Sequence, residues 1–309
     1  MKGSSRCVFS ILFIVAALLI ITAKSQAQTR QTTGSRALTL GIVFQGGAEP
    51  VKKHFHPLVD YAARKLSPNG ATTGIVMVAP TQGQMMKLLE EKRVDFYMES
   101  AYPTYLINRL GAARILLRRW KGGVDEYRSI IFTRERGSVT RLDDLRGKIM
   151  AFEDPGSTSG YFLPKLVLLK KGFAVLEKAN LETKVAANEI GYIFAGTSDK
   201  VVSLVLQEKL AAGAISSDDY SGLEDKNKRM IAVLGETEPM PRHLLSVRKD
   251  LPEPVVKRLK EVLLNMHQDE EGRKILREAD GTTRFDLLPG GEERIRRTLI
   301  EVYRQRRTK

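Results

Sequence analysis

Apolar and polar residues follow one another along this chain in two rhythms, one typical of strands and one typical of helices. Short apolar runs predict strands at residues 38–44, 75–79, 95–98, 114–118 and 127–133. Runs with helical spacing lie between them and predict helices at residues 56–66, 82–92 and 103–110. Alternation of this kind favours an α/β fold, in which helices cover a largely parallel sheet.

A second α/β block begins near Thr140. Its pattern predicts a short helix at 142–145 and strands at 148–152, 192–195, 211–216 and 230–233. It also predicts helices from about residue 159 to Lys171 and at 198–208. Several prolines then mark a change of pattern, and helices are expected at 253–266, 272–279 and 291–304. The last of these carries its apolar residues on one face, which indicates packing.

The segment that follows the strand at 148–152 carries the strongest chemical signal. A turn at 154–156 is followed by Ser157, Thr158 and Ser159, where a hydroxyl can cap the next helix. The first N–H groups of a helix lack partners within it and carry the positive end of its dipole, so they suit an anion. Three hydroxyls add donors for a tetrahedral oxyanion such as phosphate, phosphonate or sulfate. An ordinary capped helix is the plainer interpretation and stays open.

The N-terminal residues indicate where the protein works. Two basic residues precede an apolar run at 8–23, and Ser25 and Ala27 fit the small-residue positions that a signal peptidase reads. We therefore predict a signal peptide at 1–27 and a periplasmic location. An uncleaved membrane anchor stays open, because the run is only somewhat short for a span. Cys7, the one cysteine, would leave with the signal, which excludes disulfides and thiolate chemistry in the mature chain.

The formal net charge of +14 favours anionic partners through electrostatic steering. The basic residues are spread along the chain among acids, and with one Trp and an export signal we expect no nucleic-acid binding. The four histidines and the pair Asp218–Asp219 offer no complete ligand set, so we expect no metal and no cofactor. The run at 156–160 has Thr158 at its centre and is not a nucleophile elbow. We expect no catalytic residues and no enzyme.

The run Asp-Pro-Gly-Ser-Thr-Ser-Gly at 154–160 resembles the signature of the phosphate/phosphite/phosphonate-binding proteins of bacterial ABC importers. Further pieces are similar to that family in the same order, at 41–45, 94–96, 101–102, 142–148 and 271–276. The resemblance implies a type II periplasmic binding protein fold, with two lobes that close on a ligand in the cleft between them. Each lobe is then a mixed sheet flanked by helices. The resemblance implies that lobe 2, at 133–234, is inserted between the two parts of lobe 1, at 38–132 and 235–309.

The resemblance also implies ligand-binding positions. The hydroxyl residues 157–159 match the family's oxyanion cradle, and Tyr102 matches an aromatic hydroxyl of the opposing lobe. Phe44 and Gln45 match the loop after the first strand, which faces the cleft. Judged without the resemblance, Tyr102 could equally pack in the core, and Gln45 could lie in a solvated loop.

The chain departs from the family's pattern where the ligand would bind. Glu99 and Ser100 stand where the family usually has Gly-Pro, and an ionised Glu99 would repel a phosphonate unless a cation or ligand ammonium faced it. It could instead be tied to a nearby Lys or Arg. Ser198, which follows Thr197, stands where the family commonly has a His. Ser216 stands near the position where the family has an Asp. We include all four of Glu99, Thr197, Ser198 and Ser216 among the ligand-binding candidates, and their polarity suggests a small anion other than an aminophosphonate.

These observations predict an exported solute-binding protein. It would capture a small oxyanion of the phosphate, phosphite or phosphonate class by lobe closure and deliver it to the permease of an ABC importer. We expect a monomer that meets the membrane only through the permease or through an uncleaved N-terminal anchor. The alternative is a ligand-sensing periplasmic domain that passes its closed state to a signalling partner.

Overall fold

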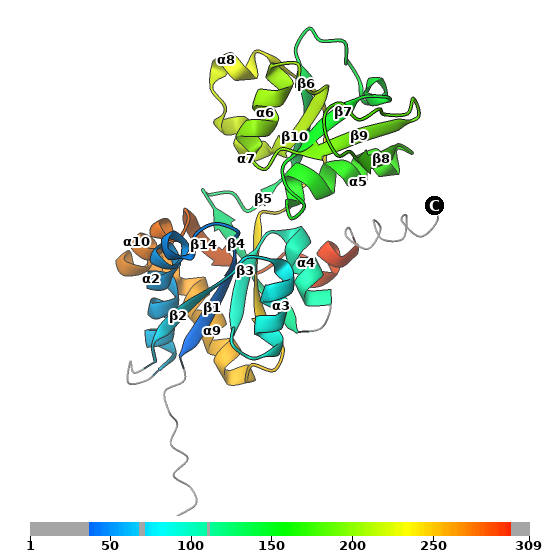
Figure 1. Ribbon diagram of the computed structural model, residues 1–309. Coiled ribbons are helices and arrows are strands. Elements are labelled where there is room, and N and C mark those ends of the chain that lie inside the picture. Colours follow the sequence, from blue (N-terminus) through cyan, green and yellow to red (C-terminus); the bar gives the residue numbers. More distant parts are fainter. Residues whose placement is uncertain (1–36, 68–71, 110–111, 298–309) are drawn as a thin grey trace, which may run out of the picture. The chain divides into compact units, whose positions relative to one another are not determined.

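The computed structural model describes residues 37–67, 72–109 and 112–297. The predicted signal peptide at 1–27 and the end of the predicted helix at 291–304 lie outside these ranges. The described chain forms two six-stranded mixed sheets, each flanked by helices, which confirms the predicted α/β fold (Figure 1). Among the described residues, no helix combines the length and the apolar character that a bilayer crossing requires.

The first sheet has the strand order β14-β4-β13-β3-β1-β2. Its strands are β1 (Leu38–Val43), β2 (Gly74–Ala79), β3 (Phe96–Glu99), β4 (Ala113–Lys121), β13 (His243–Arg248) and β14 (Thr282–Asp286). Strand β1 runs parallel to β2 and β3, whereas β13 is antiparallel to β3 and β4. The helices of this sheet are α2 (Ala48–Leu66), α3 (Gln82–Glu90), α4 (Ala101–Arg109), α9 (Glu253–Asn265) and α10 (Glu270–Glu278). A short turn, η3 (Met266–Gln268), joins the last two, and residues 291–297 are helical.

The second sheet has the order β11-β6-β10-β7-β9-β8. Its strands are β6 (Ser129–Arg134), β7 (Ile149–Phe152), β8 (Ala174–Glu177), β9 (Glu189–Phe194), β10 (Ala212–Ser216) and β11 (Ile231–Glu236). The four strands β7 to β10 are parallel, and β6 runs antiparallel to its two neighbours, β10 and β11. Its helical elements are η1 (Leu142–Leu145), η2 (Thr158–Phe162), α5 (Leu163–Lys170), α6 (Ser198–Leu206), α7 (Ser217–Gly222) and α8 (Asp225–Lys228).

The chain passes between the two sheets twice. Two short strands, β5 (Glu126–Tyr127) and β12 (Met240–Pro241), pair antiparallel at the passage. The lobe boundaries expected near Phe132 and Leu234 fall inside β6 and β11, both of which belong wholly to the second sheet. The passages therefore lie before Ser129 and after Glu236. The reason is that the apolar run at 127–133 is two strands, which pair in different sheets.

Other elements differ from the prediction in the start of one helix and in two strands that were not predicted. Helix α2 begins at Ala48 and contains Pro57, so the prediction of a start at residue 56 was too late. Thr81 caps α3, because its side chain accepts a hydrogen bond from the N–H of Gln84 at 3.2 Å. The polar strand β14 and the mixed strand β13 carry no clean alternation, and the pattern predicted neither.

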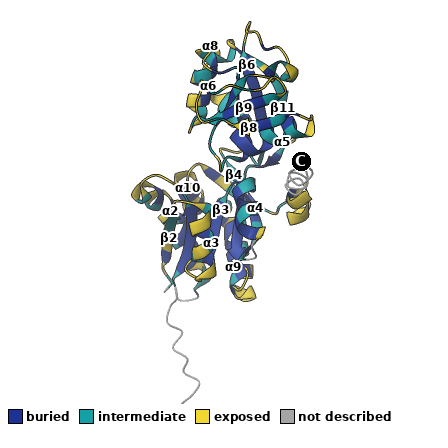
Figure 2. Cartoon of the chain, turned by 45° about the vertical axis from the view of Figure 1, so that its right-hand side comes forward, coloured by how far each residue is buried: buried dark blue, intermediate teal, exposed yellow. Residues whose placement is uncertain are grey.

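Each sheet buries an apolar cluster on each of its faces, and Figure 2 shows the strands dark with exposed positions on the surrounding helices. A further cluster joins elements of both sheets. In it Ala101 of α4 packs with Phe162, Leu163 and Leu166 of η2 and α5, and with Leu244 of β13. Since these residues are buried, removal of apolar surface from water holds α4 against the start of α5.

A buried ion pair ties the strands of the first sheet together. The guanidinium Nη2 of Arg248 lies 3.1 Å from Oδ1 of Asp95, and each side chain is only 4% exposed. The other carboxylate oxygen of Asp95 accepts a hydrogen bond from the N–H of Thr39 at 2.9 Å. Nε of Arg248 donates to the carbonyl of Val94 at 3.1 Å. The pair therefore links β1, the start of β3 and β13.

We expect Asp95→Ala to lower the free energy of unfolding by about 3 kcal/mol, because it leaves a buried guanidinium charge without this partner. Urea denaturation of the purified protein measures the change. The control is Glu49→Ala, which removes an exposed partner of Lys52 and should alter stability by about 0.5 kcal/mol or less. Equal small losses in the two variants would show that the Asp95–Arg248 pair does not stabilise the sheet.

Candidate functional site

A cavity of about 560 Å³ lies where several loops meet, and we call it the central cleft. Phe44 and Gln45 reach it from the loop after β1, and Glu99 from the end of β3. Residues 153–159 follow β7, and Ser216 ends β10. These residues lie at the carboxyl ends of four strands, β1, β3, β7 and β10, each of which has a parallel neighbour. Ligands of α/β folds commonly bind at such strand ends.

Most of the predicted ligand-binding residues line the central cleft. The lining includes Ser157, Thr158, Ser159, Phe44, Gln45, Ser216 and Glu99. The structure does not place the other three among the described lining residues. The ring of Tyr102 stacks on that of Phe162, with centroids 4.1 Å apart. Thr197 caps α6 by accepting from the N–H of Lys200, and Ser198 is the first residue of that helix.

Ser157 begins the helical segment of the cleft. Its hydroxyl oxygen accepts a hydrogen bond from the N–H of Gly160 at 2.8 Å, which makes it the N-cap that the sequence indicates. The same hydroxyl donates to Oε2 of Glu153 at 2.8 Å. The helical turn that follows, η2, is a π-turn and leads directly into α5. π-Turns occur frequently at functional sites.

Thr158 connects elements of the two sheets. Its hydroxyl donates to Oγ of Ser100 at 2.9 Å and accepts from the N–H of Tyr102 at 2.9 Å. Tyr127, on the passage strand β5, also lines the cleft. Thr158 and Ser159 are buried, at 1% and 5% exposure. The hydroxyls of Ser157 and Thr158 therefore already bond to protein groups, and a ligand has to replace some of these bonds.

The backbone offers further donors at the same place. The N–H groups of Thr158 and Ser159 open the helical segment, where helical geometry supplies no internal acceptor. The N–H of Gly160 is taken by Ser157. The start of η2 can therefore present two main-chain donors together with hydroxyls, which is the arrangement that binds phosphate at helix N-termini.

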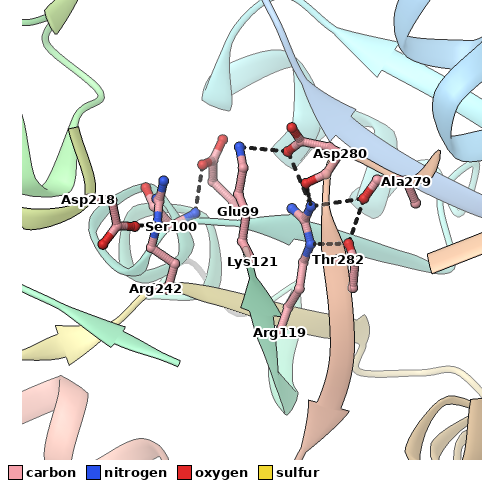
Figure 3. A network of polar contacts seen from close by, with 9 residues as sticks. All are labelled: Glu99, Ser100, Arg119, Lys121, Asp218, Arg242, Ala279, Asp280 and Thr282. Atoms are coloured by element: carbon pink, nitrogen blue, oxygen red, sulfur yellow. Dashed lines mark hydrogen bonds and ion pairs between the residues drawn. The ribbon is translucent and has the colours of Figure 1, made fainter. Parts of the chain in front are cut away.

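The charged side chains of the cleft are mostly acidic. Glu99, Glu153, Asp154 and Asp219 line it, together with the cations Lys121 and Arg242. Both cations have carboxylate partners. Nε of Arg242 lies 2.6 Å from Oδ2 of Asp218, and Nζ of Lys121 lies 2.8 Å from Oδ2 of Asp280 (Figure 3). The positive net charge of the chain is thus not concentrated in the central cleft.

Glu99 is the last residue of β3 and lines the central cleft. Figure 3 shows its carboxyl group turned back to its neighbour, with Oε1 accepting from the N–H of Ser100 at 2.6 Å. Among the described residues Glu99 forms no ion pair. The structure therefore does not show the Lys or Arg partner that was considered as an alternative. Burial raises the pKa of Glu99 to about 7, and the charge of Asp154 adds to this while Arg119 opposes it. Near neutral pH its carboxyl group can therefore donate a hydrogen bond.

The pKa of Glu153 is also raised. Burial raises the pKa of its carboxyl group, against the hydrogen bond from Ser157, and the charges of Asp154 and Asp219 act in the same direction as burial. Two carboxyl groups with raised pKa values, to about 7 for Glu99, thus lie next to the hydroxyl run. An oxyanion meets less repulsion there than the count of acids suggests.

Sequence analysis missed several residues of the cleft. Tyr127 comes from β5, and Arg242 and His243 follow β12, so the pairing of these two passage strands brings them together. The guanidinium of Arg242 lies 4.6 Å from the ring centroid of Tyr127. The only sequence signal at this place was the pair of prolines on either side of Met240. They indicate an irregular segment but do not reveal that it pairs with β5. No group of His, Cys, Asp and Glu among the described residues is arranged to hold a metal ion.

The chain is similar to known proteins over most of its length. Residues 40–288 match the family model described as ABC transporter, phosphonate, periplasmic substrate-binding protein. The protein XAC2383 from Xanthomonas citri, solved with chloride, is 29% identical, with a TM-score of 0.80 over 89% of this chain and 100% of that chain. A structure of the same protein bound to ATP is also 29% identical, with a TM-score of 0.79 over 88% of this chain and 98% of that chain.

A more distant structure shows the same fold. PhnD1 from Prochlorococcus marinus, solved in complex with methylphosphonate, is 17% identical, with a TM-score of 0.63 over 88% of this chain and 98% of that chain. Together with the two mixed sheets described above, these matches confirm the predicted type II periplasmic binding protein fold.

The raised pKa of Glu99 has a measurable consequence for stability. In the folded protein its carboxyl group holds its proton up to about pH 7, whereas the ordinary value is 4.5. Between these values the folded state binds more protons than the unfolded state, so the free energy of unfolding falls as pH rises through this window. We expect Glu99→Gln to be more stable than the parent protein by about 1–3 kcal/mol at pH 8 and equal to it near pH 4.

Urea denaturation at several pH values measures this difference. Exposed Glu49→Gln is the control and should give no difference that grows with pH. If the stability gain of Glu99→Gln is the same at pH 4 and pH 8, the carboxyl group is not held neutral by burial.

Proposed function

Because this chain belongs to the family of periplasmic substrate-binding proteins of ABC phosphonate transporters, we propose that it captures a small oxyanion and delivers it to the permease of an ABC importer. The oxyanion is of the phosphate, phosphite or phosphonate class. The family is a substrate-binding component of transport and not an enzyme. In this proposal residues 1–27, which lie outside the described ranges, direct export to the periplasm and are removed. The mature protein works as a monomer.

The hydroxyl run at the start of η2 is the observation that supports this proposal most strongly. Ser157, Thr158 and Ser159 line the central cleft beside main-chain donors and opposite the loop that carries Phe44 and Gln45. A bound oxyanion would accept hydrogen bonds from the N–H groups of Thr158 and Ser159 and from hydroxyls that rotate toward it. Micromolar binding requires about 8 kcal/mol. Several hydrogen bonds to a charged group, at about 1.5–3 kcal/mol each, can supply it after ordering costs.

Lobe closure provides the mechanism of capture. The two passages between the sheets meet at β5 and β12, and these strands are short enough to act as a hinge. Tyr127 and Arg242 line the cleft from that place and would follow its movement. Closure brings the loop after β1 and the start of η2 onto the same ligand. The closed form is then the state that the permease recognises.

The acidic groups of the cleft restrict the ligand. A dianion would be repelled by ionised carboxylates, and the raised pKa values of Glu153 and of Glu99, about 7 for the latter, lessen that repulsion. Protonated carboxyl groups donate to phosphonate oxygens and favour binding. The relative XAC2383 has been solved with chloride and with ATP, and both of these ligands are anions. This is consistent with an anion-binding cleft in the present chain.

Ser157→Ala should weaken the binding of the oxyanion at least tenfold, because it removes a hydroxyl donor to a charged ligand. The ligand for this measurement is whichever of phosphate, phosphite and methylphosphonate shifts thermal unfolding most, and titration calorimetry gives the affinity. The ligand-free variant should lose only about 0.5–2 kcal/mol of stability, from the missing cap.

Thr197→Ala is the matched control, because Thr197 also caps a helix but lies outside the lining of the central cleft. It should cost similar stability and leave affinity unchanged. If both variants bind the oxyanion alike, the proposed cradle is refuted.

A further inference from the structure

A second, larger cavity adjoins the central cleft. It has a volume of about 1110 Å³ and lies against the carboxyl end of β1, the start of α2 and the segment after α10. We call it the side chamber. The two cavities share part of their lining, namely Val43, Phe44, Glu99, Lys121 and His243. A ligand held at the hydroxyl run can therefore extend past these residues without leaving the protein.

The side chamber is largely apolar. Its apolar wall consists of Ile42, Val43, Phe44, Pro50, Val51, Phe55 and Met98. Phe44 lines both cavities, and 46% of its surface is exposed, which is high for a large aromatic residue. An exposed aromatic ring at the junction of a polar cleft and an apolar cavity offers a surface on which an apolar group can pack.

Two cations of the side chamber are paired with protein groups, so they do not require a second anion in the ligand. Arg119 is 2% exposed, and its guanidinium group donates to Oγ1 of Thr282 at 2.7 Å and to Oδ2 of Asp280 at 3.1 Å (Figure 3). Lys121 pairs with the same Asp280 at 2.8 Å. Arg119 and Lys121 are therefore satisfied by the protein. Two other charged residues of the lining, Arg277 and Glu278, are exposed and of opposite sign, so the chamber can accept an uncharged group.

One polar atom at the junction has no protein partner. Nδ1 of His243 is buried and makes no hydrogen bond in the described part of the chain. Burial, with the charges of Arg119, Arg242 and Lys121, lowers the pKa of His243, so its imidazole is neutral. A neutral ring that borders both cavities can form a hydrogen bond with a ligand that passes from one to the other.

We propose that the side chamber receives the organic group of the ligand, and that this protein selects phosphonates or phosphate monoesters with a sizeable apolar or aromatic substituent. This inference rests on the proposed function, since the head group is placed at the hydroxyl run. A bare oxyanion fills neither cavity, whereas volumes of about 300–1,000 Å³ are those of sites for larger organic ligands. Burial of the substituent against Phe44 and the apolar wall adds affinity that a methyl group cannot supply.

A pair of ligands with the same head group tests the inference. Titration calorimetry on the exported protein compares methylphosphonate with benzylphosphonate, which differ only in the substituent. We expect benzylphosphonate to bind at least tenfold more tightly. Binding of methylphosphonate with equal or higher affinity overturns the inference and leaves the proposed function standing. If neither compound binds, and phosphate and phosphite also fail, the proposed function and the inference are both overturned.

Gly47→Phe fills the side chamber without touching the hydroxyl run. Gly47 lines the chamber with φ −60°, and a Cβ placed there meets only Cδ of Pro50, at 3.9 Å. The variant should lose the preference for benzylphosphonate and keep its affinity for methylphosphonate within twofold. Gly222→Phe is the matched control, because Gly222 also has open space around it and lies outside both linings. It should keep the preference.

Equal preference in Gly47→Phe and the parent protein would show that benzylphosphonate does not occupy the side chamber, and would overturn the inference. Thermal unfolding establishes that each variant is folded. If Gly47→Phe does not fold, the smaller substitution Gly47→Leu takes its place, and the comparison of the two ligands on the parent protein remains decisive by itself.

Discussion

The hydroxyl groups at the start of η2 make hydrogen bonds that hold elements of both sheets together, and the same groups are the donors that an oxyanion needs. Thr158 bonds to Ser100 and to the main chain of Tyr102, while Ser157 bonds to Glu153. Each of these bonds satisfies a group that burial would otherwise leave unpaired. A ligand therefore binds by exchange, and its affinity is the difference between two sets of hydrogen bonds. This constraint explains why a helix N-terminus suited to anions is also well packed.

The charges of the cleft follow from the same constraint. A cleft lined by free cations would hold any anion, whereas here Lys121 and Arg242 have carboxylate partners. Of the four acids that line the cleft, Glu99 and Glu153 have pKa values raised by partial burial, to about 7 for Glu99. Selection then depends on hydrogen-bond geometry and on the shape of the cavity more than on net charge. The apolar side chamber extends this principle, because it distinguishes ligands by their substituents.

The fold was predictable where apolar periodicity is strong. The strands β1, β2 and β7 and the helices α3 and α9 lie close to their expected positions, because each coincides with an apolar run or with apolar residues at helical spacing. The strands β13 and β14 were not predictable, since their residues alternate poorly and their pairing with β4 is distant in sequence. The early start of α2 was hidden by Pro57, which the helix accommodates in its interior.

The candidate site was predictable where its residues are contiguous. The run at 157–159 forms one turn, so its placement followed from the helix that it caps. Tyr102 could not be placed, because an aromatic ring can direct its hydroxyl at a ligand or stack on a neighbour, and here it stacks on Phe162. Tyr127, Arg242 and His243 meet only because two short strands pair at the passage between the sheets. Sequence patterns do not reveal such a pairing.

The central claim is that an oxyanion replaces the internal hydrogen bonds of the hydroxyl run. A crystal structure of the protein with its tightest-binding phosphonate tests this most directly. We predict that the phosphonate oxygens accept hydrogen bonds from the N–H groups of Thr158 and Ser159, with the hydroxyl of Thr158 turned from Ser100 to the ligand. A head group bound elsewhere, with the bonds from Thr158 to Ser100 and from Ser157 to Glu153 intact, would contradict the account.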